Sequence, residues 1–128
     1  MDGIGTQRRI RALRGATTVE HDAADEIRDA TRELLRTIVE RNALNPDDII
    51  SAIFTVTSDL RSEFPARAAR ELGWIEVPLL CTMEIPVPGA LERCIRVLLH
   101  TEAAPSRPAM RHVYLRGARA LRPDLLAD

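Results

Sequence analysis

The stretch RCIRVLLH, residues 93–100, sets the central structural question of this sequence. Its apolar residues indicate a buried β-strand, in which successive side chains point to opposite faces. Arg96 then shares a face with Cys94 and Leu98, so a strand that is apolar on both faces carries a permanent positive charge. An unpaired buried guanidinium is very costly, and we therefore expect an anion to meet Arg96.

The sequence on either side of this strand predicts two helices among five or six strands. Further strand patterns cover residues 10–19, 49–57, 75–83, 111–115 and 119–122, and helical patterns cover 21–42 and the stretch from Pro65 to Gly73. Asp22 is predicted to cap the first helix. This order predicts an α/β (α+β) fold in which a mixed β-sheet is covered on one face by the two helices. Because 128 residues supply nothing to cover the other face, we expect one domain, 1–128, that forms an oligomer.

The composition argues against several functional classes. Eighteen Lys or Arg are matched by nineteen Asp or Glu, and aromatic residues make up 3% of the chain, so we expect no nucleic-acid partner. No run approaches the roughly 18 apolar residues of a membrane span, and the N-terminus lacks a signal-peptide pattern. We therefore expect no membrane association and a cytoplasmic location. Cys81 and Cys94 lack metal-ligand spacing, and no glycine-rich nucleotide motif is present, so we expect no metal and no cofactor.

Four residues form a candidate anion site. Arg14 lies, like Arg96, on a predicted strand, Glu84 follows the 75–83 strand, and Tyr114 lies on a later short strand. Each also has a purely structural interpretation. Arg14 at a strand end could reach water, an ion pair between Arg96 and Glu84 could stand without any ligand, and Tyr114 could be a core residue. As a set, they are typical of a site that holds a polyanion and needs little proton transfer.

Six segments taken together resemble the small monofunctional chorismate mutases of the AroH class. They are LRGATTVE (13–20), FPARAAREL (64–72), CTMEIPVPGAL (81–91), CIRVLLH (94–100), RHVYL (111–115) and LRPDL (121–125). The resemblance implies a homotrimer built around a pseudo-α/β barrel, with active sites between neighbouring subunits. It also implies the rearrangement of chorismate to prephenate in phenylalanine and tyrosine biosynthesis, without metal or cofactor. The anion opposite Arg96 would then be the substrate.

The resemblance implies a role for each site residue. Arg14, helped by Tyr114, is expected to bind the enolpyruvyl carboxylate, and Arg96 is expected to face the ether oxygen and a carboxylate oxygen. Glu84 and the neighbourhood of Cys81 are expected to hold the ring hydroxyl. The rest of the expected cleft consists of Leu80, Cys81, Thr82 and Met83 on the ring side, Phe64 as a wall, and Arg67 and Arg70 near the mouth.

Two positions depart from the pattern of this family. Arg67 stands where some relatives carry lysine, and Leu80 stands where some carry threonine, so a contact at position 80 would use the backbone. Residues 1–7 look like an untethered extension, to which we assign no role.

Two other functions stay open at this point. One is a non-catalytic trimeric protein that binds a small carboxylate, and the other is an imine deaminase of a related trimeric fold. Glu84 favours the mutase, because a ring hydroxyl explains a fixed carboxylate beside cations whereas a simple keto acid does not.

Overall fold

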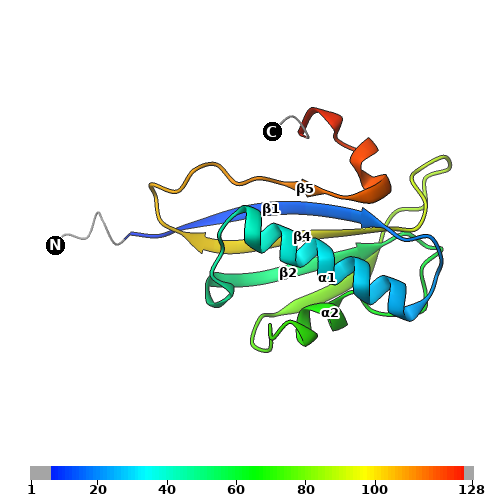
Figure 1. Cartoon of the computed structure of the whole chain (residues 1–128), viewed down its shortest axis with the longest axis horizontal. Coiled ribbons are helices and arrows are strands. Elements are labelled where there is room, and N and C mark those ends of the chain that lie inside the picture. Colours follow the sequence, from blue (N-terminus) through cyan, green and yellow to red (C-terminus); the bar gives the residue numbers. More distant parts are fainter. Residues whose placement is uncertain (1–6, 126–128) are drawn as a thin grey trace.

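β4 (Cys94–Ala103) is the central strand of a five-stranded sheet in this computed structural model, which describes residues 7–125 (Figure 1). The strand order is β3-β2-β4-β1-β5. The remaining strands are β1 (Arg9–Thr18), β2 (Ile49–Val56), β3 (Leu79–Met83) and β5 (Val113–Tyr114). β4 runs antiparallel to both β1 and β2, whereas β3 and β5 run parallel to their neighbours β2 and β1. The prediction of a mixed sheet is confirmed.

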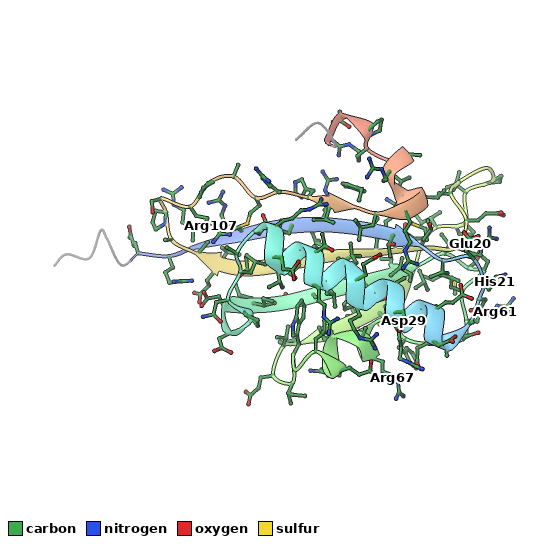
Figure 2. The ribbon with its side chains drawn as sticks, in the orientation of Figure 1. Glu20, His21, Asp29, Arg61, Arg67 and Arg107 are labelled. Carbon is green, nitrogen blue, oxygen red and sulfur yellow. The ribbon has the colours of Figure 1, made fainter. Side chains whose placement is uncertain are left out.

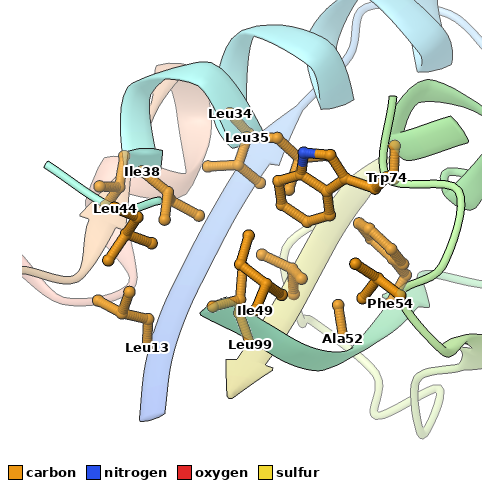
Figure 3. Packing of buried hydrophobic residues seen from close by; sticks show 14 residues of the cluster. Leu13, Leu34, Leu35, Ile38, Leu44, Ile49, Ala52, Phe54, Trp74 and Leu99 are labelled. Atoms are coloured by element: carbon orange, nitrogen blue, oxygen red, sulfur yellow. The ribbon is translucent and has the colours of Figure 1, made fainter. Parts of the chain in front are cut away.

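Two helices, α1 (Ala24–Arg41) and α2 (Ala66–Glu71), cover one face of this sheet. The buried residues of α1 recur at helical spacing and form its apolar stripe: Ile27, Ala30, Thr31, Leu34, Leu35 and Ile38. Figure 3 shows part of this stripe above the sheet, in one cluster with Leu13, Phe54 and Trp74. The predicted α+β class, with two helices on a mixed sheet, is therefore correct.

The two faces of β4 differ sharply. Ile95, Val97 and Leu99 are buried beneath the helices, whereas Arg96 and Leu98 are exposed on the opposite face. The prediction that this strand is buried on both faces is wrong at Arg96 and Leu98, because residues 7–125 cover this face only around Cys94 and Ala16, which pack against Tyr114 and Ala118. Arg96 therefore carries its charge on an open surface.

Asp22 does not cap α1, contrary to the prediction. The N-cap is Ala23, and it makes no side-chain capping hydrogen bond. Asp22 instead accepts hydrogen bonds at Oδ1 from the main-chain N–H groups of Arg61 (2.9 Å) and Ser62 (3.0 Å). These bonds, that from Arg61 above all, lower the pKa of the Asp22 carboxyl. The carboxylate thus joins the start of α1 to the segment that leads into α2.

Two predicted strands have different bounds or a different structure. Residues 119–122 are not a strand, because the chain turns at Arg116, where φ is 51°, into a 3-10 helix over Arg116–Ala120. The strand predicted over 75–83 begins only at Leu79, because Pro78 has no N–H to donate to a ladder. Residues 1–6 of the predicted extension lie outside the described residues.

Gly15 lies on β1 directly beneath α1, where there is no room for a side chain. A Cβ at this position would stand 2.8 Å from Ile38 Cδ1 and 3.1 Å from Leu34 Cδ1, and both leucine and isoleucine are fully buried. We expect Gly15→Ala to lower the free energy of unfolding by about 1–3 kcal/mol, measured by urea denaturation, because the buried side chains of Ile38 and Leu34 must move within a packed core to admit the methyl group.

Thr17, two residues further on the same face, provides the matched control. Its Oγ1 is buried and has no hydrogen-bond partner among residues 7–125. Thr17→Val keeps the shape and removes an unsatisfied hydroxyl, so stability should stay unchanged or rise by about 1 kcal/mol. Equal losses in both variants would mean that β1 tolerates no substitution and that the close approach at Gly15 is not the cause.

Candidate functional site

The face of the sheet opposite the two helices holds a pocket of about 340 Å³. Strand register builds it, because Ala16 of β1 and Thr55 of β2 pair with Arg96 from its two sides, and Arg14 pairs with Leu98. Residues that pair across strands project to the same face, so these side chains gather at one place. Other parts of the chain complete the lining with Ile53, Glu84, Tyr114, Leu121 and Arg122.

Arg96 and Glu84 form an ion pair inside this pocket. The Nε of Arg96 lies 3.4 Å from Oε2 of Glu84, and the Thr55 hydroxyl donates a hydrogen bond to the same oxygen. The N–H of Glu84 donates to the carbonyl of Val56 (2.9 Å), which fixes the residue just beyond β3. The side chain of Arg96 is 45% exposed and that of Glu84 28% exposed. Because a guanidinium has five donors, this pair leaves Arg96 able to bind a further anion.

Arg14 and Tyr114 lie on adjacent strands of the same pocket. Tyr114 pairs with Ala16 and is almost fully buried in a small cluster, so it is both a core residue and a lining residue. Arg14 is exposed, and its main-chain N–H donates to Nδ1 of His112 (3.0 Å). The structure therefore brings together Arg14, Glu84, Arg96 and Tyr114 as the sequence predicted.

Two polar lining residues, Thr55 and Arg122, were missed by the sequence analysis. Thr55 sits in an apolar strand, and only the register of β2 against β4 places its hydroxyl beside Glu84. Arg122 belongs to the LRPDL segment, but the prediction of a strand there hid its position in the pocket. Its guanidinium makes a two-point ion pair with Asp124, at 3.1 Å and 3.0 Å.

The charges lining the pocket are predominantly positive. Arg14, Arg96 and Arg122 line it together with one carboxylate, that of Glu84, while Asp124, outside the lining, pairs with Arg122. A site with this balance attracts an anion that carries more than one negative charge, and separate guanidinium groups can fix separate ends of it. The pocket therefore suits a small polyanion with a further polar group for Glu84.

A second pocket, of about 320 Å³, collects most of the other predicted residues. Phe64, Cys81, Thr82 and Met83 are among its lining residues. Phe64 is 69% exposed, so its ring is available for contact with another surface. Cys81 also packs against the main core, and burial raises the pKa of its thiol, as expected for a small apolar residue. Within one chain, the predicted cleft residues are thus divided between two pockets.

Arg67, Arg70 and Leu80 line neither of these pockets. Arg67 lies on α2 with its side chain 60% exposed, at the edge of the molecule (Figure 2). Arg70 donates from Nη1 to the carbonyls of Trp74 (2.5 Å) and Ile75 (2.6 Å), which ties it to the turn after α2. Leu80 is exposed on the same open sheet face as Arg96, but outside the pocket.

Neither a metal centre nor a membrane-spanning helix is found in the described part of the chain. Residues 7–125 contain no group of three or more His, Cys, Asp or Glu side chains that could hold a metal ion. No helix among them has the length and apolar character needed to cross a bilayer.

Comparison with known proteins gives consistent matches over most of the chain. The model of the family "Chorismate mutase type I" matches residues 10–125. The chain is 50% identical over 117 residues to chorismate mutase AroH of Thermus thermophilus, covering 91% of this chain and 96% of that protein. It is 45% identical over 117 residues to chorismate mutase AroH of Bacillus subtilis, covering 91% and 92%. The structure is similar to that of a chorismate mutase from Clostridium thermocellum, with a TM-score of 0.83, 52% identity, and coverage of 86% of this chain and 98% of that chain.

Glu63 fixes the segment that carries Phe64 and Arg67. Its Oε2 lies 2.6 Å from Nη1 of Arg28 and 3.3 Å from Nε of Arg67, and its Oε1 accepts the N–H of Phe64 at 2.9 Å. The hydrogen bond from Phe64, followed by that from Arg28, lowers the pKa of the Glu63 carboxyl.

We expect Glu63→Gln to lower the melting temperature at neutral pH, and this loss to disappear in acid. Because the pKa is lower in the folded state, the stabilisation is complete above the ordinary value of 4.5 and is lost as pH falls through the folded-state pKa. Thermal melts of wild type and variant between about pH 3 and 7 measure the difference. Glu76→Gln, at an exposed position, is the control. If the melting temperature of Glu63→Gln stays equally far below that of wild type in acid, the ion pairs of Glu63 are not the cause of the difference.

Proposed function

The chain belongs to the chorismate mutase type I family, and on that premise we propose that the pocket beside Arg96 is where chorismate is rearranged to prephenate. Membership makes the protein an isomerase of aromatic amino acid biosynthesis. It also decides against the carboxylate-binding and imine deaminase alternatives. Arg14, Arg96 and Glu84 line one open pocket, and this observation is the main support for placing the active site there.

The proposed substrate is a dianion, and three arginines line the pocket that would hold it. Chorismate carries one carboxylate on its ring and one on its enolpyruvyl side chain. We assign Arg14 and Tyr114 to the enolpyruvyl carboxylate, and the pocket position of Arg122 supports a further carboxylate contact. Binding of the carboxylates holds a flexible molecule in the compact form in which its reacting carbons approach each other.

Arg96 is assigned to the electrostatic part of catalysis. The reaction is a 3,3-sigmatropic rearrangement, which needs no acid, base or nucleophile. If the C–O bond breaks ahead of C–C bond formation, negative charge develops on the ether oxygen. A guanidinium that is held in place by Glu84 (3.4 Å) and aimed at that oxygen stabilises the transition state more than the substrate.

Glu84 has two tasks in this proposal. Its Oε2 holds Arg96 and accepts from Thr55, and its carboxylate is also the acceptor for the ring hydroxyl of the substrate. Glu84 can pair with Arg96 and bind the ring hydroxyl at the same time, because its carboxylate offers about four lone-pair positions.

We propose a homotrimer in which a neighbouring subunit completes the cleft. The open face around Arg96, the exposed Leu80 and the strongly exposed Phe64 support this arrangement, since a single chain leaves apolar surface uncovered. Phe64 and Arg67 of one subunit would then cover the Arg96 pocket of the next. Chorismate and a second and third copy of the chain are thus the proposed partners, and a cytoplasmic location, where such biosynthetic intermediates are found, is part of the proposal.

The activity is tested by the ultraviolet absorbance of chorismate, and the role of Arg96 by its variants. Wild type should consume chorismate and form prephenate without added metal, and a chelator should leave the rate unchanged. Arg96→Lys keeps the charge but loses the rigid fork, so kcat should fall on the order of 100-fold or more. Arg96→Ala should be slower still.

Arg67→Ala is the matched control for loss of an arginine. Its solvent-screened contact binds substrate and transition state about equally, so KM should rise while kcat stays near that of wild type. Thermal melts should show all three variants folded. Wild-type turnover by Arg96→Lys, or unfolding of Arg96→Ala, would make Arg96 a structural residue; absence of prephenate from wild type would remove the proposed function.

A mixing experiment tests whether two subunits form each cleft. Arg96→Ala and the double variant Phe64→Ala/Arg67→Ala should each be weakly active at low substrate concentration. After unfolding and refolding together in equal amounts, random trimers should regain about a quarter of the wild-type sites, because one interface in each mixed trimer carries both intact halves. If the activity stays at the average of the two separate variants, the cleft is not shared between subunits. A protein that is fully active and monomeric by light scattering would contradict the shared cleft as well.

A further inference from the structure

His112 makes a hydrogen bond that defines its protonation state. The main-chain N–H of Arg14 donates to Nδ1 of this ring at 3.0 Å. A backbone N–H can only donate, so Nδ1 carries a lone pair and the neutral ring holds its proton on Nε2. An imidazolium, with protons on both nitrogens, cannot accept this bond.

The bond extends a very short strand. β5 pairs with β1 only at Gly15 and Ala16, and the N–H of Leu115 donates to the carbonyl of Ala16 at 2.9 Å. His112 precedes β5, and its side chain provides the acceptor for Arg14, one residue before the pairing begins. The ring therefore fixes the edge of β1 at the residue whose side chain lines the pocket.

The main chain beside His112 is itself anchored to the end of α1. The buried side chain of Asn42 accepts the N–H of Arg111 at Oδ1 (2.7 Å) and donates from Nδ2 to the carbonyl of Arg111 (3.0 Å). This two-point contact holds the residue next to His112 in place. Because the neighbouring main chain is fixed, the His112 ring accepts the Arg14 N–H from a defined position.

The charges that face the ring oppose its protonation. Arg14 of β1 and Arg122 of the C-terminal segment are the cations beside it, with Asp124 paired to Arg122, and Asn42 at the end of α1 is uncharged. Burial first, and then these two arginines, lower the pKa of His112 below its ordinary value of 6.5. The ring is neutral at physiological pH, in agreement with the hydrogen bond.

We propose that neutral His112 is a positioning residue that holds Arg14 in place for substrate binding, and that its protonation loosens this edge of the pocket without affecting the chemistry at Arg96. The proposal rests on the proposed function, in which Arg14 binds a carboxylate of the substrate. Acid should therefore raise KM and leave kcat near its neutral value. The loss should begin only below the ordinary histidine pKa, because the folded-state pKa is lowered.

Steady-state kinetics between about pH 5 and 8 distinguish the effect of losing the hydrogen-bond acceptor from the effect of protonating the ring. His112→Asn places Oδ1 where Nδ1 stood and does not titrate, so KM should equal that of wild type at pH 8 and stay flat in acid. His112→Phe has no acceptor, and its KM should be about 3- to 10-fold higher at every pH. His21→Asn is the control, because His21 pairs with Glu26 beside Glu20 and Arg61, at the end of the molecule where α1 begins (Figure 2). It should keep the wild-type pH profile.

Three results would overturn the proposal. A wild-type KM that is flat in acid would mean that protonation leaves Arg14 in place, and a KM that falls would mean that the imidazolium binds the carboxylate itself. Nitrogen NMR of the free protein decides independently of activity, since it should find Nδ1 unprotonated at neutral pH and an Arg14 amide signal that shifts as His112 titrates. A proton on Nδ1 at neutral pH would refute the hydrogen bond, whereas a protein with the expected NMR behaviour and no chorismate turnover would fail only the proposed function.

Discussion

Arg96 stands on a part of the sheet that residues 7–125 leave open, and the arrangement of the site depends on this placement. The alternation of β4 buries Ile95 and Val97 beneath α1 and α2 and turns Arg96 to the other side. A guanidinium on that side remains hydrated and available, at little cost to folding. The helices can therefore provide the stability of the fold on one face while the opposite face keeps its charges for a ligand.

The arginines of the pocket are held in place by neighbouring residues and keep further hydrogen-bond donors for a ligand. Arg96 is held by Glu84, which is in turn held by Thr55 and by its own main-chain bond to Val56. Arg14 is held from behind by His112. In each case the supporting contact fixes one atom of the arginine and leaves its other donors for a ligand. Such prior positioning is what a reaction without acid, base or nucleophile requires from a protein.

The sequence predicts the features that depend on local pattern. The α1 stripe, the strand around Arg96 and the mixed sheet follow from the spacing of apolar residues, and Arg14, Glu84, Arg96 and Tyr114 meet as their segments predicted. Features that depend on register or on long-range contacts do not follow. Thr55 becomes a site residue only through its pairing with Arg96, and Asp22, which looks like a helix cap, is taken by N–H groups about forty residues away. The apolar pattern of this strand covers both faces, so it also does not indicate that the sheet is open around Arg96.

A crystal structure of the protein with prephenate bound tests the position of the active site most directly. We expect product on the open sheet face, with an oxygen within about 3 Å of the Arg96 guanidinium, a carboxylate at Arg14, and a neighbouring subunit's Phe64 segment over the pocket. Product bound elsewhere, for example in the larger hollow beside Thr57 and Asp59, with Arg96 still paired only to Glu84, would contradict this position.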